Sequence, residues 1–413
     1  MYRMDNASVP CAAVRRGQTT MDMELPPESL TRRITELRRE IHRHPELAFE
    51  EVRTAERIST ELRRLGLMPE YGGPGTGVIA RLDGNGRAGP VVALRAEMDA
   101  LPGEETTGLE FASLVPGKVH ACGHDAHMAM VLGAAEMLVE RPPPGRTLFL
   151  FEPAEESGGG ARTLIDAGAL EGVNAIFGGH VTHHYATGEI MVADGIVTAQ
   201  SDTFVIRVTG RGGHGARPHE AVDAVIVAGL LISAIQTLVT RELNPFHPTV
   251  VTIGKLTAGS AGNVIAEEAV LEGTIRTTDP KVREHVIAGI KRMGEAAATL
   301  HRARVAVNFA DGYPPVINTA REALIARKAA GQVVGPDGLV AMEYPSMGAE
   351  DFSFFLQQVP GCYVRFGARP PGSDYIPLHS PAFTIDERVL PIGAAFFNRV
   401  VREAIGALAR QAR

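Results

Sequence analysis

The sequence predicts an α/β protein of two domains, in which a domain built on a parallel sheet is interrupted by a smaller, inserted α+β domain. Short apolar runs alternate with segments of helical periodicity between residues 78 and 179, which is typical of a mostly parallel sheet covered by helices. The pattern changes near Ala199 and changes back near Glu322. The expected division is a larger domain of residues 28–198 and 315–413 and an inserted domain of residues 199–314.

Residues 1–27 are expected to form a flexible leader. They mix Arg, Met and Pro and contain no continuous apolar stretch, which argues against a secretory signal. Apolar residues then recur at helical spacing from Leu30 to Ile41 and again over residues 54–65, where Gly66 supplies a stop. Two helices are therefore expected before the first strand.

The first part of the larger domain then alternates strands with helices. Its apolar runs are of the length and kind found in buried strands. The strands are expected at residues 78–82, 91–95, 147–151 and 175–179, and the helices at residues 128–139 and 161–167.

The inserted domain has a different pattern, because its first strand alternates polar and apolar residues as a half-exposed strand does. Its strands are expected at residues 202–209, 249–256, 269–276 and 305–309, and its helices at residues 221–240 and 280–300. The order β-α-β-β-α-β is that of a small ferredoxin-like domain.

Composition limits the classes of function. The 413 residues carry a net charge of −7, which argues against a nucleic-acid partner, and no run approaches the ~18 apolar residues of a membrane span. Three cysteines are not a disulfide framework. We therefore expect a cytoplasmic protein with neither a membrane nor a nucleic acid as partner.

The segment His120-Ala-Cys122-Gly-His124-Asp125 is dense in groups that bind metals. Gly123 lets the backbone turn tightly, so that Cys122 and His124 can reach one ion. A helix that starts near His127 would place Cys122 at its N-terminal end and lower the pKa of the thiol. A polar loop that enters a helix is the alternative explanation.

Further metal-capable residues follow strands of the predicted sheet. Glu155 and Glu156 come directly after the strand that ends near Phe151, where one carboxylate can bind metal and the other can act as a base. His180 is expected at the end of the next strand, and His379 lies far downstream between two prolines. A solvated acidic turn is the alternative for the two glutamates.

Polar groups in three other places are candidates for supporting roles. Glu97 and Asp99 follow a buried strand and can orient a ligand histidine, or they can cap a turn. His214 lies in a Gly-rich stretch of the inserted domain that could reach toward a ligand. Asn263 and Arg276 are polar anchors, and the fork of Arg276 suits a carboxylate unless it is merely a surface charge.

Taken together, these motifs resemble the metal-dependent aminoacylase/carboxypeptidase family. The branch is that of hippurate hydrolases, bacterial N-acyl-amino-acid amidohydrolases and plant auxin-conjugate hydrolases. The resemblance runs from about Thr31 onward. Its markers are Ala96-Glu-Met-Asp-Ala-Leu-Pro102, His120-Ala-Cys-Gly-His-Asp125, Glu152-Pro-Ala-Glu-Glu156, Gly212-Gly-His-Gly215, Asn263-Val-Ile265, Met347-Gly-Ala-Glu-Asp-Phe352 and Leu378-His379.

The resemblance implies a homodimeric enzyme that hydrolyses N-acyl-L-amino acids with two divalent ions, Zn or Mn first and Co or Ni as alternatives. The inserted domain would be the lid through which subunits pair. The implied roles are Cys122 as bridging ligand; His124, Glu156, His180 and His379 as further ligands; Glu155 as general base; His214 as oxyanion stabiliser, often across the dimer; His214, Asn263 and Arg276 as substrate-binding residues; and Asp99 as support for a ligand.

Two departures from the branch stand out. Glu97 replaces the usual Asp, and Thr182-His183-His184-Tyr185 replaces a stretch that usually contains proline. These side chains could line the acyl pocket, or His183 could compete for metal. The acyl group and the amino acid that the enzyme prefers are left open.

Three rival functions remain at this point. The first is a dipeptidase, carboxypeptidase or carbamoyl-amino acid hydrolase on the same scaffold. The second is a thiol enzyme with Cys122 as nucleophile. The third is a catalytically silent metal-binding or dimerisation module, which would have little reason to keep both Glu155 and Glu156.

Overall fold

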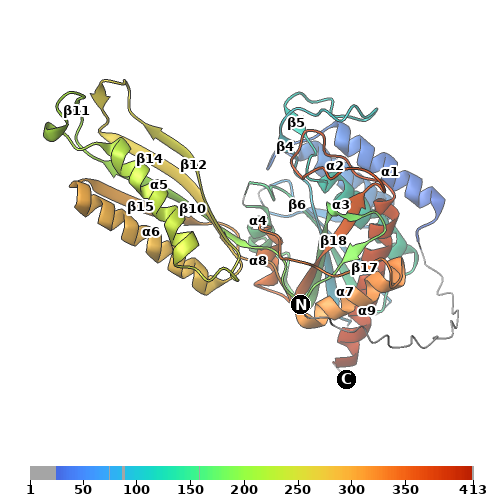
Figure 1. Ribbon diagram of the computed structural model, residues 1–413. Coiled ribbons are helices and arrows are strands. Elements are labelled where there is room, and N and C mark those ends of the chain that lie inside the picture. Colours follow the sequence, from blue (N-terminus) through green and yellow to red (C-terminus); the bar gives the residue numbers. More distant parts are fainter. Residues whose placement is uncertain (1–24, 74, 86–88, 158, 412–413) are drawn as a thin grey trace, which may run out of the picture.

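The computed structural model describes residues 25–73, 75–85, 89–157 and 159–411. Most of the predicted leader, residues 1–24, lies outside this range. Figure 1 shows a large α/β body and a slender unit beside it, joined by a narrow waist. The predicted α/β class with a parallel-dominated sheet is confirmed by the strand pairing.

An eight-stranded sheet forms the centre of the large body. The four central strands β6, β3, β7 and β18 run parallel to one another. At one edge, β2 pairs antiparallel with β6, and β1 pairs antiparallel with β2. In spatial order the strands are β1 (Pro69–Tyr71), β2 (Val78–Asp83), β6 (Arg146–Glu152), β3 (Val91–Glu97), β7 (Ala175–Ala186), β18 (Gly361–Arg369), β8 (Ile190–Met191) and β17 (Leu339–Val340).

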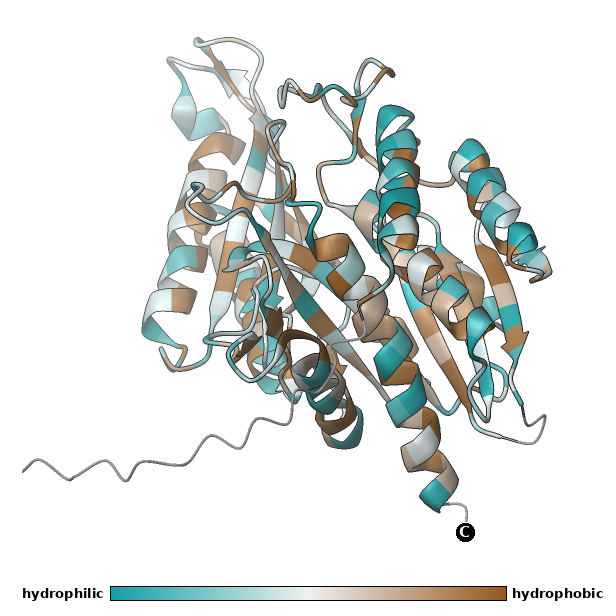
Figure 2. Ribbon diagram, turned by 90° about the vertical axis from the view of Figure 1, so that its right-hand side faces the viewer, coloured by the Kyte–Doolittle hydropathy of each residue, from teal (hydrophilic) through white to brown (hydrophobic). Residues whose placement is uncertain are grey.

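Helices cover the two faces of this sheet unequally. Five longer helices pack with one core cluster: α1 (Glu28–Arg43), α2 (Val52–Arg64), α3 (His124–Glu140), α7 (Ala320–Val334) and α9 (Val389–Gln411). Two short helices, α4 (Gly160–Asp166) and α8 (Phe352–Leu356), pack with the cluster on the other face. Figure 2 shows brown, hydrophobic strands between helices whose outer surfaces carry teal residues.

The face under α4 and α8 becomes polar toward the carboxyl ends of the strands. In β3, Val91 and Ala93 belong to the core on this face, so the alternation of a strand puts Arg95 and Glu97 there too. In β7, Ile176 belongs to the same core, so the alternation of the strand points His180 to this face as well. The short helices thus leave room for a polar site at this edge of the sheet.

The slender unit contains a four-stranded antiparallel sheet with the order β12-β14-β10-β15. Its elements are β10 (Gln200–Thr209), α5 (Ala224–Arg241), β12 (Thr249–Ala258), β14 (Glu268–Thr277), α6 (Pro280–His301) and β15 (Arg304–Asp311). Both helices contribute to one core with the sheet. Asp223 and Asp279 accept hydrogen bonds from the first backbone N–H groups of α5 and α6, which explains where these helices begin.

Short paired segments complete the chain. They are β4 (Leu101–Pro102) with β5 (Lys118–Val119), β9 (Gly195–Ile196) with β16 (Ile317–Asn318), and β11 (Gly213–His214) with β13 (Val264–Ile265), beside the 3-10 helix Pro218–Glu220. The exact bounds of the inserted domain, 199–314, and its role as a lid stay predictions.

Two elements differ from the sequence-based expectation in ways that matter for the site. Helix α3 begins at His124 rather than near residue 128, because Gly123 adopts a left-handed conformation immediately before it. Strand β7 does not end at Gly179 but continues to Ala186, since β18 pairs with it along that length. The expectation that His180 lies at the end of a strand is therefore wrong, because His180 lies within β7.

The expectation that no run approaches the length of a membrane span is wrong for one helix. Among the described residues, α5 alone has the length and apolar composition of a span, and 33% of it is buried. The buried residues, among them Val227 and Leu231, belong to the core under the four-stranded sheet. Its opposite face carries Val225, Ile226 and Leu230, which are 43%, 57% and 39% exposed.

Candidate metal centre and active-site cleft

A cavity of about 590 Å³ lies where the slender unit joins the polar edge of the large sheet. Residues from both parts of the large body and from the inserted segment line it, although they are far apart in the sequence. The lining residues singled out in the sequence are Cys122, Glu155, Glu156, His180, Arg276 and His379.

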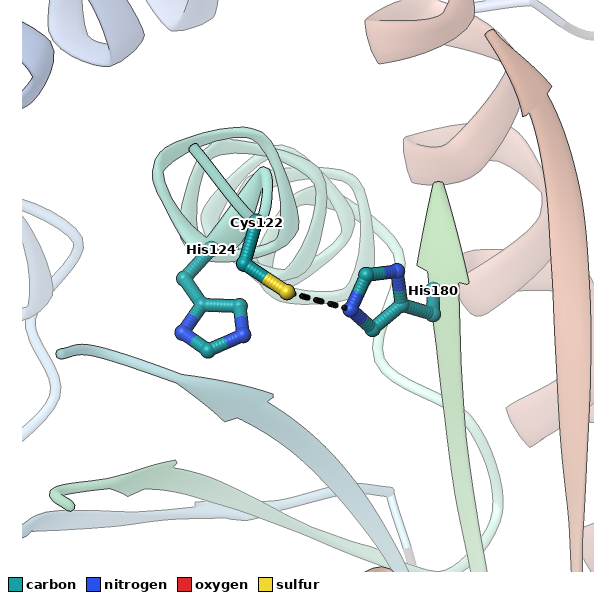
Figure 3. Close-up of side chains that lie close together, drawn as sticks. All are labelled: Cys122, His124 and His180. Atoms are coloured by element: carbon teal, nitrogen blue, oxygen red, sulfur yellow. Dashed lines mark hydrogen bonds between the residues drawn. The ribbon is translucent and has the colours of Figure 1, made fainter. Parts of the chain in front are cut away.

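Cys122, His124 and His180 form the first cluster, drawn in Figure 3. All three are buried, and their ligand atoms lie within 4.8 Å of one another. The Sγ of Cys122 is 3.2 Å from Nε2 of His180. The thiol and imidazoles of such a cluster are the donors that bind Zn²⁺ and related ions.

Gly123 makes the close approach of Cys122 and His124 feasible. Its φ of +90° is a left-handed conformation that glycine adopts without strain. A Cβ at this position would lie 2.3 Å from Cγ2 of Val181 on strand β7. A side chain at residue 123 would therefore push α3 away from the strand that carries His180.

The two imidazoles are oriented so that one nitrogen of each is left for a ligand. His124 Nδ1 donates to the carbonyl oxygen of Asp99 at 2.8 Å and lies 3.2 Å from its carboxylate. His180 Nδ1 donates to the carbonyl oxygen of Val181 at 2.7 Å. Nε2 of His124 is buried without a hydrogen-bond partner among the described residues, so the donor set fits a cation.

Glu156 and His379 close the second cluster with Cys122. Nε2 of His379 is 3.1 Å from Oε1 of Glu156. The backbone N–H of His379 donates to the carbonyl oxygen of Ala121, which ties this distant loop to the segment that carries Cys122. Asp99 also accepts a hydrogen bond from the backbone N–H of Glu156 at 3.0 Å, so one carboxylate touches both clusters.

Glu155 stands between these ligands and a group of buried acids. Its ligand atom belongs to one cluster with His124 and Glu156 and to another with Glu350 and Asp351. Burial, followed by the charges of Glu350, Asp351 and Glu156, raises the pKa of Glu155 well above its ordinary value. A carboxylate in such surroundings accepts a proton readily, as a general base must.

The loop before Glu155 is held by buried hydrogen bonds. Ala154 has a φ of +54°, which is unusual for a residue with a side chain. The buried Glu51 accepts from the backbone N–H of Ala154 at 2.9 Å, and the hydroxyl of Tyr313 donates to the carbonyl oxygen of Glu155. The direction in which Glu155 points is therefore fixed by Glu51 from one side and Tyr313 from the other.

The expected lowering of the Cys122 pKa by the N-terminus of α3 is wrong. Burial, and then the charges of Glu156 and Glu155, raise the pKa of this thiol well above its ordinary value. Burial is the largest cause, because a charged thiolate is disfavoured away from water. A thiol of raised pKa is a poor nucleophile, which counts against the thiol-enzyme alternative.

A buried ionic cluster behind the cavity was missed in the sequence. Arg95 pairs with Asp351 at 2.7 Å and Glu350 at 3.1 Å, and also with Glu97 and Glu152. Burial raises the pKa of Glu152 to about 7 and that of Asp351 well above its ordinary value. The sequence does contain one indication of this cluster, an Arg within an apolar strand, because a buried charge requires partners of opposite charge.

Glu97 orients a histidine that is not one of the predicted ligands. His127 Nδ1 donates to Glu97 at 2.8 Å, and His127 Nε2 accepts from the backbone N–H of Val181 at 2.9 Å. Both nitrogens of His127 are thus engaged, and its ring lies 4.6 Å from that of His180. Glu97, which is longer than the Asp usual at this position in the family branch, thus accepts a hydrogen bond from His127, whereas Asp99 contacts His124.

His183 and His184 have different positions. His183 is buried, donates from Nε2 to the carbonyl oxygen of Thr384 at 2.7 Å and accepts at Nδ1 from the backbone N–H of Ile376. Both of its nitrogens are used, so His183 does not compete for metal. His184 and Tyr185 instead line a second cavity beside the first, and that this cavity takes the acyl group stays a prediction.

The predicted substrate-binding residues of the inserted segment do not all reach the cavity. Arg276 lines it, and its Nη1 donates to the carbonyl oxygen of Met347. His214 and Asn263 are exposed on and beside the β11–β13 pair and do not line the cavity in a single chain.

The fold and this donor set together are those of a dinuclear metallohydrolase. The chain belongs to peptidase family M20/M25/M40, whose family model matches residues 93–403. The predicted family and the predicted enzyme class, a hydrolase of amide bonds, are both confirmed.

Three relatives illustrate the range of the family. The chain is 39% identical to IAA-amino acid hydrolase ILR1-like 4 of Arabidopsis thaliana, over 87% of this chain and 82% of the relative. It is 38% identical to N-acetyl-L-cysteine deacetylase of Bacillus subtilis, over 89% and 87%. It is 39% identical to thermostable carboxypeptidase 2 of Saccharolobus solfataricus, over 87% and 92%.

Solved structures share the fold. An aminohydrolase from methicillin-resistant Staphylococcus aureus superposes with a TM-score of 0.85 at 34% identity, over 92% of this chain and 97% of that chain. The Bacillus subtilis YXEP protein, described as a dinuclear metal binding peptidase of the M20 family, gives 0.79 at 34% identity, over 93% and 99%.

Proposed function

We propose that this protein hydrolyses the amide bond of N-acyl-L-amino acids to a carboxylic acid and a free amino acid. One observation carries the proposal: Glu155, a buried carboxylate of raised pKa, lies within one cavity beside two clusters of metal-binding side chains. The relatives that hydrolyse indole-acetyl amino acid conjugates and deacetylate N-acetyl-L-cysteine support the substrate class.

Two divalent cations would be held by five side chains of this chain. These side chains would be Cys122, His124, Glu156, His180 and His379. A mixture of thiolate, imidazole and carboxylate favours Zn²⁺ or Mn²⁺, with Co²⁺ and Ni²⁺ as alternatives. When bound, the ions supply the Lewis acidity that makes water a nucleophile near neutral pH.

Residues of this chain then move the proton and hold the substrate. Glu155 accepts a proton from the attacking water and later donates it to the nitrogen of the leaving amine. Arg276 binds the carboxylate of the amino acid part, for which its planar fork is suited. His214 stabilises the oxyanion and, together with Asn263, also binds substrate; Asp99 keeps His124 in position.

His214 cannot contact a substrate in the cavity of its own chain, because it does not line that cavity. We propose that it is supplied across a homodimer that forms through the inserted unit. Support comes from the exposed apolar face of α5 and from β12, an edge strand whose Val250 and Leu256 are 42% and 45% exposed. The cytoplasmic location and the absence of nucleic-acid and membrane partners stay predictions.

The variant Glu155→Gln tests the proposed role of the base. It keeps the size of the side chain but cannot accept the proton, so we expect kcat to fall by about 10² to 10⁴. Metal content, measured by elemental analysis, should match that of the wild-type protein. Near-normal turnover of N-acetyl or hippuryl amino acids by the variant would remove Glu155 from this role.

A peptidase is the second candidate, since the carboxypeptidase relative is as similar as the others. Dipeptides, N-carbamoyl amino acids and N-acyl amino acids assayed side by side on the metal-loaded protein separate the two. A higher kcat/KM on dipeptides would favour the peptidase.

A further inference from the structure

Arg365 lies on the boundary between the metal-site cavity and a second cavity of about 430 Å³. The two cavities share three lining residues, Ser346, Arg365 and Leu378. Arg365 is therefore in a position to touch a molecule that extends from one cavity into the other.

The strand register fixes the direction of this side chain. Arg365 of β18 is the direct partner of His180 on β7, and partners in a parallel pair point to the same face of the sheet. Across β18, Arg365 also faces Met191, which lines the second cavity. Its guanidinium lies over the ring of Tyr363, with Cζ 5.1 Å from the centroid.

Arg365 lacks the counter-ions that the buried Arg38 and Arg95 have. Arg38 pairs with Asp125 at 2.7 Å, and Arg95 pairs with four carboxylates. Among the residues that the structure describes, no carboxylate pairs with Arg365, although its side chain is half-buried. An unpaired, partly desolvated guanidinium is well suited to an anionic group of a ligand, which it can bind through two parallel hydrogen bonds.

The second cavity has room and mixed chemistry for an acyl chain. Apolar side chains line it, among them Met191, Val197 and Met342, and polar groups are contributed by His184 and Thr182. Its one carboxylate, Glu343, is exposed and next to Tyr344. Arg365 is the one cation in this lining, and it lies on the side that adjoins the metal-site cavity.

We propose that Arg365 is a specificity-determining residue that selects substrates whose acyl group carries a second carboxylate, as in N-succinyl or N-glutaryl amino acids. The inference rests on the proposed function and extends it. The proposal places the carboxylate of the amino acid part on Arg276 and the acyl part in the second cavity. A carboxylate a few bonds beyond the scissile carbonyl then meets Arg365.

Paired substrates test this proposal. N-succinyl-L-alanine and N-succinamoyl-L-alanine differ only in a terminal carboxylate that is replaced by a carboxamide of similar shape. We expect the metal-loaded wild-type protein to favour the succinyl substrate in kcat/KM by at least about 10-fold, as a charged hydrogen bond allows. Arg365→Met should lose this preference through a raised KM for the succinyl substrate.

Arg369→Met is the matched control, because Arg369 lies on the same strand but lines neither cavity. It should keep the wild-type preference. Equal rates of the wild-type protein on both substrates would overturn the proposal. So would an equal loss on both substrates in Arg365→Met, which would instead assign Arg365 to the metal site.

Binding measurements separate a failure of this inference from a failure of the proposed function. Calorimetry compares both compounds on Glu155→Gln and on the double variant Glu155→Gln/Arg365→Met. Suppose that the wild-type protein hydrolyses neither compound, but the succinyl compound binds Glu155→Gln about 10-fold more tightly than the succinamoyl compound, and only when Arg365 is present. The selectivity of Arg365 then stands and the hydrolase proposal fails. Equal binding, or none, overturns the role of Arg365.

Discussion

At the scale of single residues, hydrogen bonds orient three of the proposed metal ligands, His124, His180 and Glu156. Asp99 shows this most clearly, since its backbone carbonyl holds His124 and its carboxylate accepts from the backbone of Glu156. We expect such orienting groups to contribute to the affinity for metal.

Asp99→Ala should weaken metal binding by about 10-fold to 100-fold. The backbone carbonyl that accepts from His124 remains, but Glu156 loses the acceptor of its backbone N–H and His124 loses a carboxylate 3.2 Å from its Nδ1. Calorimetric titration of the metal-free protein with Zn²⁺ or Mn²⁺ measures this change. Asp374→Ala, which removes an exposed carboxylate, is the control and should bind as the wild-type protein does. Wild-type affinity in Asp99→Ala would show that the contact has no such role.

His120 is a buried histidine that should make the metal-free protein sensitive to acid. Burial lowers the pKa of His120 from 6.5 to about 3, and neither ring nitrogen has a hydrogen-bond partner among the described residues. Since the unfolded chain binds the proton more tightly, the stability that neutral His120 contributes is present above pH 6.5 and is lost as the pH falls toward 3.

We expect the free energy of unfolding of the wild-type protein to fall more steeply below pH 6.5 than that of His120→Leu. The difference in slope is at most ~1.4 kcal/mol per pH unit. Urea denaturation between pH 7 and pH 5, without metal, measures both slopes. Parallel slopes would mean that His120 becomes protonated without unfolding the protein.

At the scale of helices and strands, α5 has two different apolar faces. One face completes the core of the inserted unit, and the other is exposed at Val225, Ile226 and Leu230. An exposed apolar face next to an edge strand is typical of a surface that pairs with another chain.

Ile226→Glu should therefore convert the proposed homodimer into a monomer, since a charge at this 57% exposed position would be buried in the interface. Light scattering after gel filtration gives the mass. Leu300→Glu, at a 70% exposed apolar position on α6, is the matched control and should stay dimeric. A wild-type monomer at micromolar concentration would refute the dimer itself.

Periodicity predicted the type of most elements, but it did not predict where the elements that carry ligands begin and end. The extension of β7 past His180 depends on its pairing with β18, which lies far along the chain. The early start of α3 depends on the left-handed Gly123, whose neighbours come from β7. Both boundaries are decided by tertiary contacts that a local pattern does not contain.

At the scale of the whole molecule, bound metal should stabilise the folded chain, because the ligands come together only after folding. At a free metal concentration about 100 times Kd, the gain is about 2.7 kcal/mol. We expect the Tm to fall when EDTA is added and to recover when Zn²⁺ or Mn²⁺ is restored. In Cys122→Ala the EDTA effect should be clearly smaller, and an unchanged effect would exclude Cys122 as a ligand.

The sequence singled out six residues that line the cavity, but it did not predict the buried ionic cluster behind them. Cys122, His124 and Glu155 stand out because their residue types and spacing suggest metal chemistry. Arg95 and Arg365 do not, because each is a single Arg in an apolar strand. Only the strand order reveals that one of them faces four carboxylates and the other faces a cavity.

The hydrogen bond from the backbone of His379 to Ala121 has a consequence for biosynthesis. The complete inserted unit is synthesised after His180 and before His379. A nascent chain can thus present Cys122, His124 and His180 early, but it gains the last ligand only when the returning segment docks beside Ala121. We therefore expect full metal loading only after the segment that carries His379 has been synthesised and has docked.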